Sequence, residues 1–146
     1  MVPADGNPEY RLDRVLAYGI LRLTIGVNLF LHGTTRLFLG GLGKFVTGIV
    51  QQFQNTPLPA WQVQAFATVL PFVEATIGVL LIVGLWTRWT AVAGSLVMVS
   101  LIFGTGLRMD WSLLFLQMFY SFLYFVLLMY REYDYYSLDA LITKKH

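Results

Sequence analysis

The sequence predicts an all-α fold: an integral membrane four-helix bundle of up-down-up-down topology, with an interfacial amphipathic helix between the first and second spans. Of the 146 residues, 57% are hydrophobic and 12% are charged, whereas soluble domains usually carry about 25% charged residues. The mean hydropathy is +0.64. Four apolar runs are each long enough for the roughly 20 helical residues that cross a bilayer. They lie at about 15–39, 65–86, 89–107 and 111–130, within a length that fits one domain.

The two ends of the sequence are expected to lie outside the bilayer. Residues 1–14 are polar and contain Pro3, Gly6 and Pro8, so we expect an N-terminal tail with little structure of its own. The first apolar run is too long for a cleavable signal peptide and lacks a small-x-small exit. Residues 131–146 are expected to form a C-terminal tail.

Glycines recur every seven residues along the first span. Glycine permits close van der Waals approach between membrane helices, and a seven-residue period keeps the glycines on one seam. These residues are Gly19, Gly26, Gly33 and Gly40. We therefore expect this seam to pack against a neighbouring helix.

The connection at 40–64 is the only sizeable segment expected outside the bilayer. Its apolar residues recur at helical spacing while polar residues fill the other face, a pattern typical of an amphipathic helix lying in the interface plane. The apolar residues are Phe45, Val46, Ile49, Val50 and Phe53. A helix that only caps the bundle would show the same pattern, so both interpretations stay open.

The remaining connections and the basic residues predict the topology. The joints at 87–88 and 108–110 are so short that adjacent helices must be antiparallel. Lys and Arg residues concentrate on the cytoplasmic side of membrane proteins. Six lie on the side that holds both termini and three on the other, which predicts cytoplasmic termini. The six are Arg11, Arg14, Arg88, Arg131, Lys144 and Lys145, and the three are Arg36, Lys44 and Arg108.

Four ionisable residues fall inside the apolar runs: Arg22, His32 and Arg36 in the first, and Glu74 in the second. A charge at membrane depth costs roughly 2.5–3.5 kcal/mol even on lenient scales, so such groups usually face a partner or a polar cavity. At 100° per residue, His32 lies about 40° from Arg36 and about 80° from Arg22. We therefore expect a buried polar centre in which Arg22 pairs with Glu74. A purely structural Arg–Glu staple is the alternative.

The fourth span carries a polar stripe that suits the same interior. Its members recur at i, i+3, i+4 and i+7, the spacing of one helix face. They are Gln117, Tyr120, Ser121 and Tyr124. We expect them to surround the polar centre, although ordinary hydrogen bonding between helices would explain them too.

Several function classes are disfavoured by composition and motifs. The net charge of +2 is too small and dispersed for nucleic-acid binding, and the chain has no cysteine for disulfides or thiolate chemistry. The only histidine besides His32 is His146, which makes a bis-histidine haem implausible. No phosphate loop, nucleophile elbow or zinc-type His/Glu pair is present, so no metal site is predicted. Arginine, glutamate, histidine and tyrosine can bind an anion or quinone oxygens and move protons, but they cannot carry electrons unaided.

Two groups of residues resemble the DoxX/DoxD-like family of small four-helix membrane proteins. The first group is Leu21-Arg22-Leu23-Thr24-Ile25-Gly26 followed by Phe30-Leu31-His32-Gly33-Thr34-Thr35-Arg36-Leu37. The second is Pro57-Leu58-Pro59 followed by Glu74-Ala75-Thr76-Ile77-Gly78 and Gly84-Leu85-Trp86-Thr87-Arg88. Arg36 stands where the family usually has lysine, and histidines that some members carry in later helices are missing.

The resemblance implies a bacterial or archaeal inner-membrane protein linked to quinone-dependent redox complexes. In one interpretation the polar centre binds a quinone head group or a small anion, and cofactor-bearing partner subunits supply electrons, since no covalent cofactor is expected. In the alternative, the chain is a non-catalytic accessory or assembly subunit. Aromatic residues of the fourth span offer either a partner surface or ordinary lipid contact; they are Phe115, Phe119, Phe122 and Phe125.

Overall fold

The computed structural model describes residues 8–143, which form helices and no strand. The elements in chain order are α1 (Pro8–Thr34), a π-helical turn (Thr35–Leu39), α2 (Leu42–Gln52), α3 (Ala60–Val83), α4 (Thr87–Leu107), α5 (Trp111–Met129), a 3-10 turn (Arg131–Tyr133) and α6 (Leu138–Thr143). Four helices are long and apolar enough to cross a membrane: α1 with its π-helical turn, α3, α4 and α5. The prediction of an all-helical membrane protein with four spans is confirmed at this level.

Two helices begin earlier than the hydropathy pattern suggested. α1 starts at Pro8 instead of near residue 15, because a proline suits the first helical turn, where no N–H partner is needed, and Glu9 suits the positive end of the helix dipole. α3 starts at Ala60 instead of near residue 65, directly after Pro59. The outer parts of the two expected tails, 1–7 and 144–146, lie outside the described residues.

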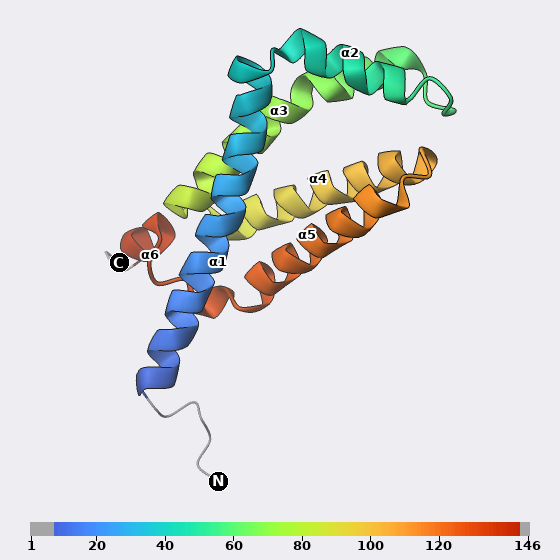
Figure 1. Ribbon diagram of the computed structural model, residues 1–146. Coiled ribbons are helices and arrows are strands. Elements are labelled where there is room, and N and C mark those ends of the chain that lie inside the picture. The colour runs from blue at the N-terminus through green and yellow to red at the C-terminus, as the bar shows by residue number, and fades with distance from the viewer. Residues whose placement is uncertain (1–7, 144–146) are drawn as a thin grey trace.

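The helices pack as two pairs (Figure 1). α1 packs along α3, and α4 packs along α5. α2 turns back over the first half of α3, while α1 and α5 approach each other near the end where α1 begins and diverge toward α2. The molecule is therefore closed at the end that holds α6, called here the termini end, and open at the α2 end.

Three glycines set the contact between α1 and α3. A Cβ on Gly33 would lie 2.4 Å from the Pro71 carbonyl oxygen, and one on Gly78 would lie 2.4 Å from the Phe30 nitrogen. Gly26 is nearly as close, at 2.9 Å from the Ile82 nitrogen. Only glycine lets the two backbones come so close together, and such close approach stabilises membrane helix pairs through van der Waals packing. The expected glycine seam is correct in its middle, but a Cβ on Gly19 would meet nothing within 4 Å, because α3 ends at Val83, before it reaches the level of Gly19.

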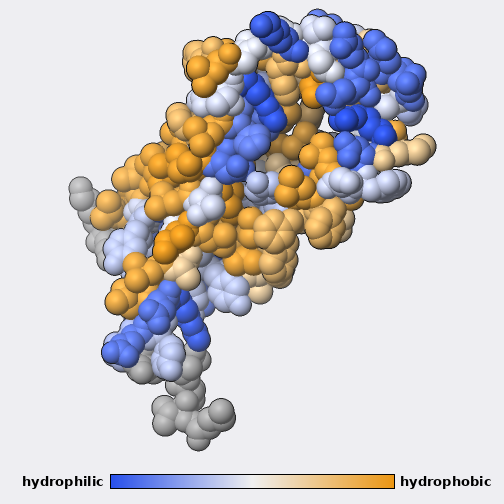
Figure 2. Space-filling model, in the orientation of Figure 1, coloured by the Kyte–Doolittle hydropathy of each residue, from blue (hydrophilic) through white to orange (hydrophobic). Residues whose placement is uncertain are grey.

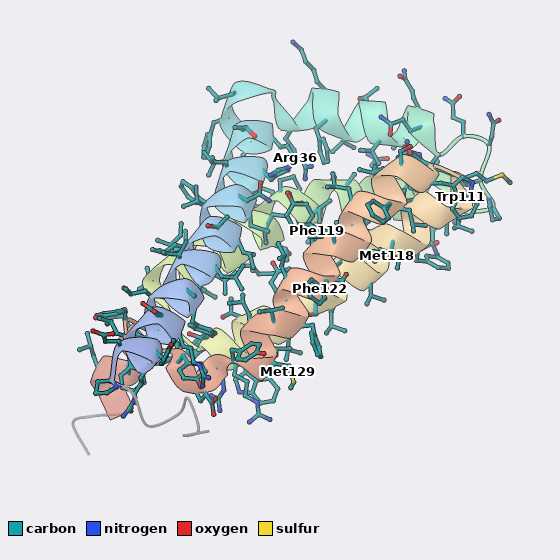
Figure 3. All side chains as sticks on the ribbon, turned by 60° about the horizontal axis from the view of Figure 1, so that its bottom comes forward. Arg36, Trp111, Met118, Phe119, Phe122 and Met129 are labelled. Atoms are coloured by element: carbon teal, nitrogen blue, oxygen red, sulfur yellow. The ribbon has the colours of Figure 1, made fainter. Side chains whose placement is uncertain are left out.

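A core of apolar residues joins the two pairs of helices toward the termini end. It consists of Tyr18, Ile25, Leu29, Ile77, Leu81, Ala91, Met98, Tyr124 and Leu127. Figure 2 shows an apolar body with hydrophilic atoms over the connection between α2 and α3 and over the first turns of α1. The outer side of α5 is apolar and exposed: Trp111, Met118, Phe119, Phe122 and Met129 point away from the other helices (Figure 3).

Candidate functional site: a cavity beside an ion pair

Glu74 forms an ion pair with Arg36, not with Arg22 as the sequence analysis expected. The Arg36 guanidinium donates to the Glu74 carboxylate, and Glu74 is only 4% exposed. The guanidinium carbon of Arg36 also lies 4.6 Å from the ring centre of Phe45 on α2, a favourable cation–π distance. This pair therefore ties together the end of α1, the middle of α3 and the start of α2.

The register between α1 and α3 explains why Arg22 is excluded from this pair. Gly33 lies against Pro71 and Ala75, whereas Gly26 lies against Gly78 and Ile82. Since the helices are antiparallel, Arg22, still earlier on α1, lies opposite the end of α3 and contacts Leu81, about two turns from Glu74.

Arg22 instead fixes the C-terminal segment at the termini end. It is 2% exposed and donates to the carbonyl oxygens of Leu81 at 2.8 Å and Tyr136 at 2.5 Å. Its Nε lies 3.7 Å from the Asp134 carboxylate. Gly84 leaves room for this arrangement, because a Cβ there would lie 2.0 Å from an Arg22 nitrogen. The contacts of Arg22 thus hold the C-terminal segment in place at the termini end. Its partner Asp134 was not expected, because it lies in the segment predicted to be a tail.

His32 is not a buried member of the polar centre. Its side chain is exposed, and its Nδ1 lies 2.9 Å from the backbone oxygen of Asn28 on the same helix. The expected angle between His32 and Arg36 assumed a continuous α-helix, whereas Arg36 lies in the π-helical turn Thr35–Leu39, where the rotation per residue differs.

A cavity of about 650 Å³ lies beside the Arg36–Glu74 pair. It fills the open end between α2 and α3 on one side and α4 and α5 on the other. Most of its lining is apolar, including Ile49, Leu70 and Phe103. Figure 3 shows Arg36 reaching from the π-helical turn after α1 into the space below α2. The sequence alone did not predict this cavity, because it arises from the divergence of two helix pairs.

α2 forms one wall of the cavity with its apolar face. Phe45, Ile49 and Phe53 line the space, and these are residues that the sequence analysis assigned to the apolar side of an amphipathic helix. The Phe53 ring lies 5.4 Å from the guanidinium carbon of Arg108, so an arginine stacks on α2 at each end of its apolar face. The apolar face of α2 therefore covers the cavity.

Gln117 brings an unpartnered polar group to the cavity. The residue lines the space and is 8% exposed. Its side-chain oxygen is buried and accepts no hydrogen bond within residues 8–143. A buried acceptor without a partner is costly, and the terminal torsion of glutamine is soft. A polar ligand bound in the cavity would therefore donate the missing hydrogen bond to the Gln117 side-chain oxygen.

The other members of the polar stripe lie apart from the cavity lining. Tyr124 is fully buried with its ring against Gly94 of α4, where a Cβ would lie 2.4 Å from the ring. Ser121 donates to the Gln117 carbonyl oxygen at 3.2 Å, and Tyr120 is half-buried. The stripe thus supplies one cavity residue, one core residue and two residues at the edge of the helix contact.

The charges around the cavity balance one another. Glu74 neutralises Arg36, and Asp110 lies 3.5 Å from Arg108. A carboxylate, guanidinium donors and an amide in the lining of an apolar space can hold a neutral head group that both donates and accepts hydrogen bonds. Among the residues that the structure describes, no group of three or more His, Asp or Glu side chains is arranged to hold a metal ion.

Comparison with known proteins identifies the family. The sequence model described as DoxX matches residues 17–107, which span most of α1, all of α2 and α3, and α4. The chain therefore belongs to the DoxX family of membrane proteins, as its motifs indicated. The match includes Arg36 and Glu74 but ends before Gln117. No curated protein and no solved structure shows a significant match.

Proposed function

We propose that this DoxX-family protein is the quinone-binding membrane subunit of an oxidoreductase complex, and that the cavity beside Arg36 and Glu74 is its quinone site. The observation that carries this proposal is the combination of one large apolar cavity with an ion pair and an unpartnered amide at its lining. Sites for small organic ligands are typically apolar spaces of about 300–1,000 Å³ with a few convergent polar groups.

A quinone suits this lining better than a small anion does. Both cavity arginines already have a carboxylate within 4 Å, so the site offers little net positive charge to an anion. A quinone head group is neutral and flat, and its carbonyl oxygens accept hydrogen bonds from a guanidinium. The apolar lining suits the isoprenoid chain that carries such a molecule in the bilayer.

The chain's own residues would bind the head group and handle protons. Reduction of a quinone takes up two electrons and two protons, and the two carbonyl oxygens become hydroxyl groups. The electrons come from a cofactor-bearing partner subunit in this proposal. Arg36 donates to a carbonyl oxygen, Glu74 passes protons, and Gln117 accepts a hydrogen bond from a hydroxyl of the reduced form.

The proposed topology places both termini in the cytoplasm of a bacterial or archaeal inner membrane, with α2 at the opposite interface. The excess of basic residues on the termini side supports this orientation. Because the chain has no native cysteine, single cysteines can report it. A maleimide added outside intact cells should label Gln52→Cys and spare Leu141→Cys; the opposite labelling would invert the topology.

Binding of decylubiquinone to the purified protein tests the function. Quenching of tryptophan fluorescence should saturate for the wild type, weaken about tenfold or more for Glu74→Gln and Gln117→Leu, and stay unchanged for Ser121→Ala. Ser121 is the matched control, because it is one helical turn from Gln117 and does not line the cavity. Equally weak binding by the wild type and all three variants would contradict the quinone site. It would favour the accessory-subunit alternative, in which loss of the chain causes a membrane complex to dissociate.

A further inference from the structure

α1 carries polar side chains on a face that the other elements of residues 8–143 leave partly exposed. Asn28 is half-exposed and His32 is exposed. No hydrogen bond of the Asn28 amide is present among the described residues, and His32 uses only Nδ1, toward the Asn28 backbone oxygen. Figure 2 shows hydrophilic atoms on the upper half of α1, bordered by apolar atoms.

These groups lie deep within the membrane-spanning segment. Asn28 is 14 residues from Arg14 and 11 from Leu39, which is about 21 Å and 17 Å at 1.5 Å per residue. Hydrocarbon offers no hydrogen bonds, so an amide at this depth is stabilised by a polar partner and not by lipid tails. Something with hydrogen-bonding capacity therefore covers this face.

The residues in line with Asn28 have the spacing of a helix-pair seam. They alternate by four and three positions, which is the a/d pattern of two helices packed side by side. The seam residues are Ala17, Leu21, Thr24, Asn28, Leu31 and Thr35, all exposed or half-exposed. Leu21 also packs in part against the core of its own chain. The hydroxyls of Thr24 and Thr35 donate within their own helix, which leaves the Asn28 amide as the central polar group.

We propose that this seam is a symmetric interface, at which α1 packs in parallel against α1 of a second copy and the two Asn28 side chains hydrogen-bond to each other. An amide is self-complementary, since it carries both donors and an acceptor. Two copies inserted with the same topology present their α1 helices in parallel around a twofold axis, and a single asparagine at such a position favours a parallel dimer in one register. His32 flanks the seam and its Nε2 can bond across it.

The absence of native cysteine makes cross-linking the direct test. In membranes treated with copper phenanthroline, Thr24→Cys and Leu31→Cys should form disulfide-linked dimers of twice the chain mass. Leu23→Cys is the control, because Leu23 is exposed and lies at the depth of Thr24 but off the seam. Cross-linking of all three to the same extent, or linkage of the seam cysteines to a protein of different mass, would overturn the proposal.

A second measurement separates the interface from the fold. Förster transfer between labelled copies in detergent should give a dissociation constant about tenfold weaker for Asn28→Leu than for the wild type, the order expected for one interhelical hydrogen bond. Leu23→Ala should leave it unchanged. Because Asn28→Leu removes an unpartnered amide, its circular dichroism and yield should match the wild type. A wild-type protein that stays monomeric at all protein-to-detergent ratios would refute the interface.

Discussion

The close backbone contact of Gly33 with α3 makes Gly33→Ala a sharp test of how the site is built. A Cβ at this position would lie 2.4 Å from the Pro71 oxygen and 2.5 Å from the Ala75 nitrogen. Both atoms belong to the backbone, so the helices themselves must separate. Overpacking of this kind costs about 1–3 kcal/mol, and the better helix propensity of alanine, about 1 kcal/mol or less, offsets only part of it.

The expected result is a free energy of unfolding lower by about 1–2 kcal/mol, measured by denaturant titration in mild detergent. Quinone binding should weaken in parallel, since the same contact fixes the register that joins Arg36 to Glu74. Gly19→Ala is the control: no atom would lie within 4 Å of its Cβ, so its stability should be unchanged or higher. Equal effects of the two substitutions would refute the close α1–α3 packing.

Two further predictions concern the ion pair and the termini end. A double-mutant cycle on the free energy of unfolding with Arg36→Met and Glu74→Gln should give a coupling of about 1 kcal/mol or more. In a second cycle, the effects of Arg22→Met and Glu74→Gln should be additive within about 0.5 kcal/mol. Additive effects in the first cycle would argue against direct pairing of Arg36 with Glu74. Asp139 accepts from the backbone nitrogens of Trp86 and Thr87 at 2.8 and 2.7 Å, so Asp139→Ala should lower the free energy of unfolding by about 1 kcal/mol, the usual value of a helix cap; an unchanged value in the same titration would show that water replaces this cap.

The spans were predictable because hydrophobicity is a local property of the sequence. The burial of Glu74 was predictable too, because a carboxylate inside an apolar run needs a partner away from lipid, and Glu74 is buried in the structure. Its partner was not predictable from depth alone. The choice between Arg22 and Arg36 depends on the register that Gly33 sets against Pro71, and a register is a property of two helices together.

The rest of the site depends on tertiary structure. The cavity exists because the helix pairs diverge at the α2 end, and no single run of residues encodes that divergence. Asp134 lies in a polar segment whose sequence predicts a tail, yet its carboxylate lies beside Arg22 in the structure. His32 was misplaced because helical angles give a direction only once the neighbour's position is known.

The central claim is that a quinone occupies the cavity between α2, α3, α4 and α5, and photo-cross-linking measures this most directly. A short-chain quinone carrying a diazirine, bound to the protein in native membranes, should modify cavity residues such as Phe53, Leu70 and Gln117, and excess decylubiquinone should abolish the labelling. Adducts confined to the outer side of α5, at Phe119 and Phe122, or labelling that decylubiquinone does not reduce, would contradict the claim.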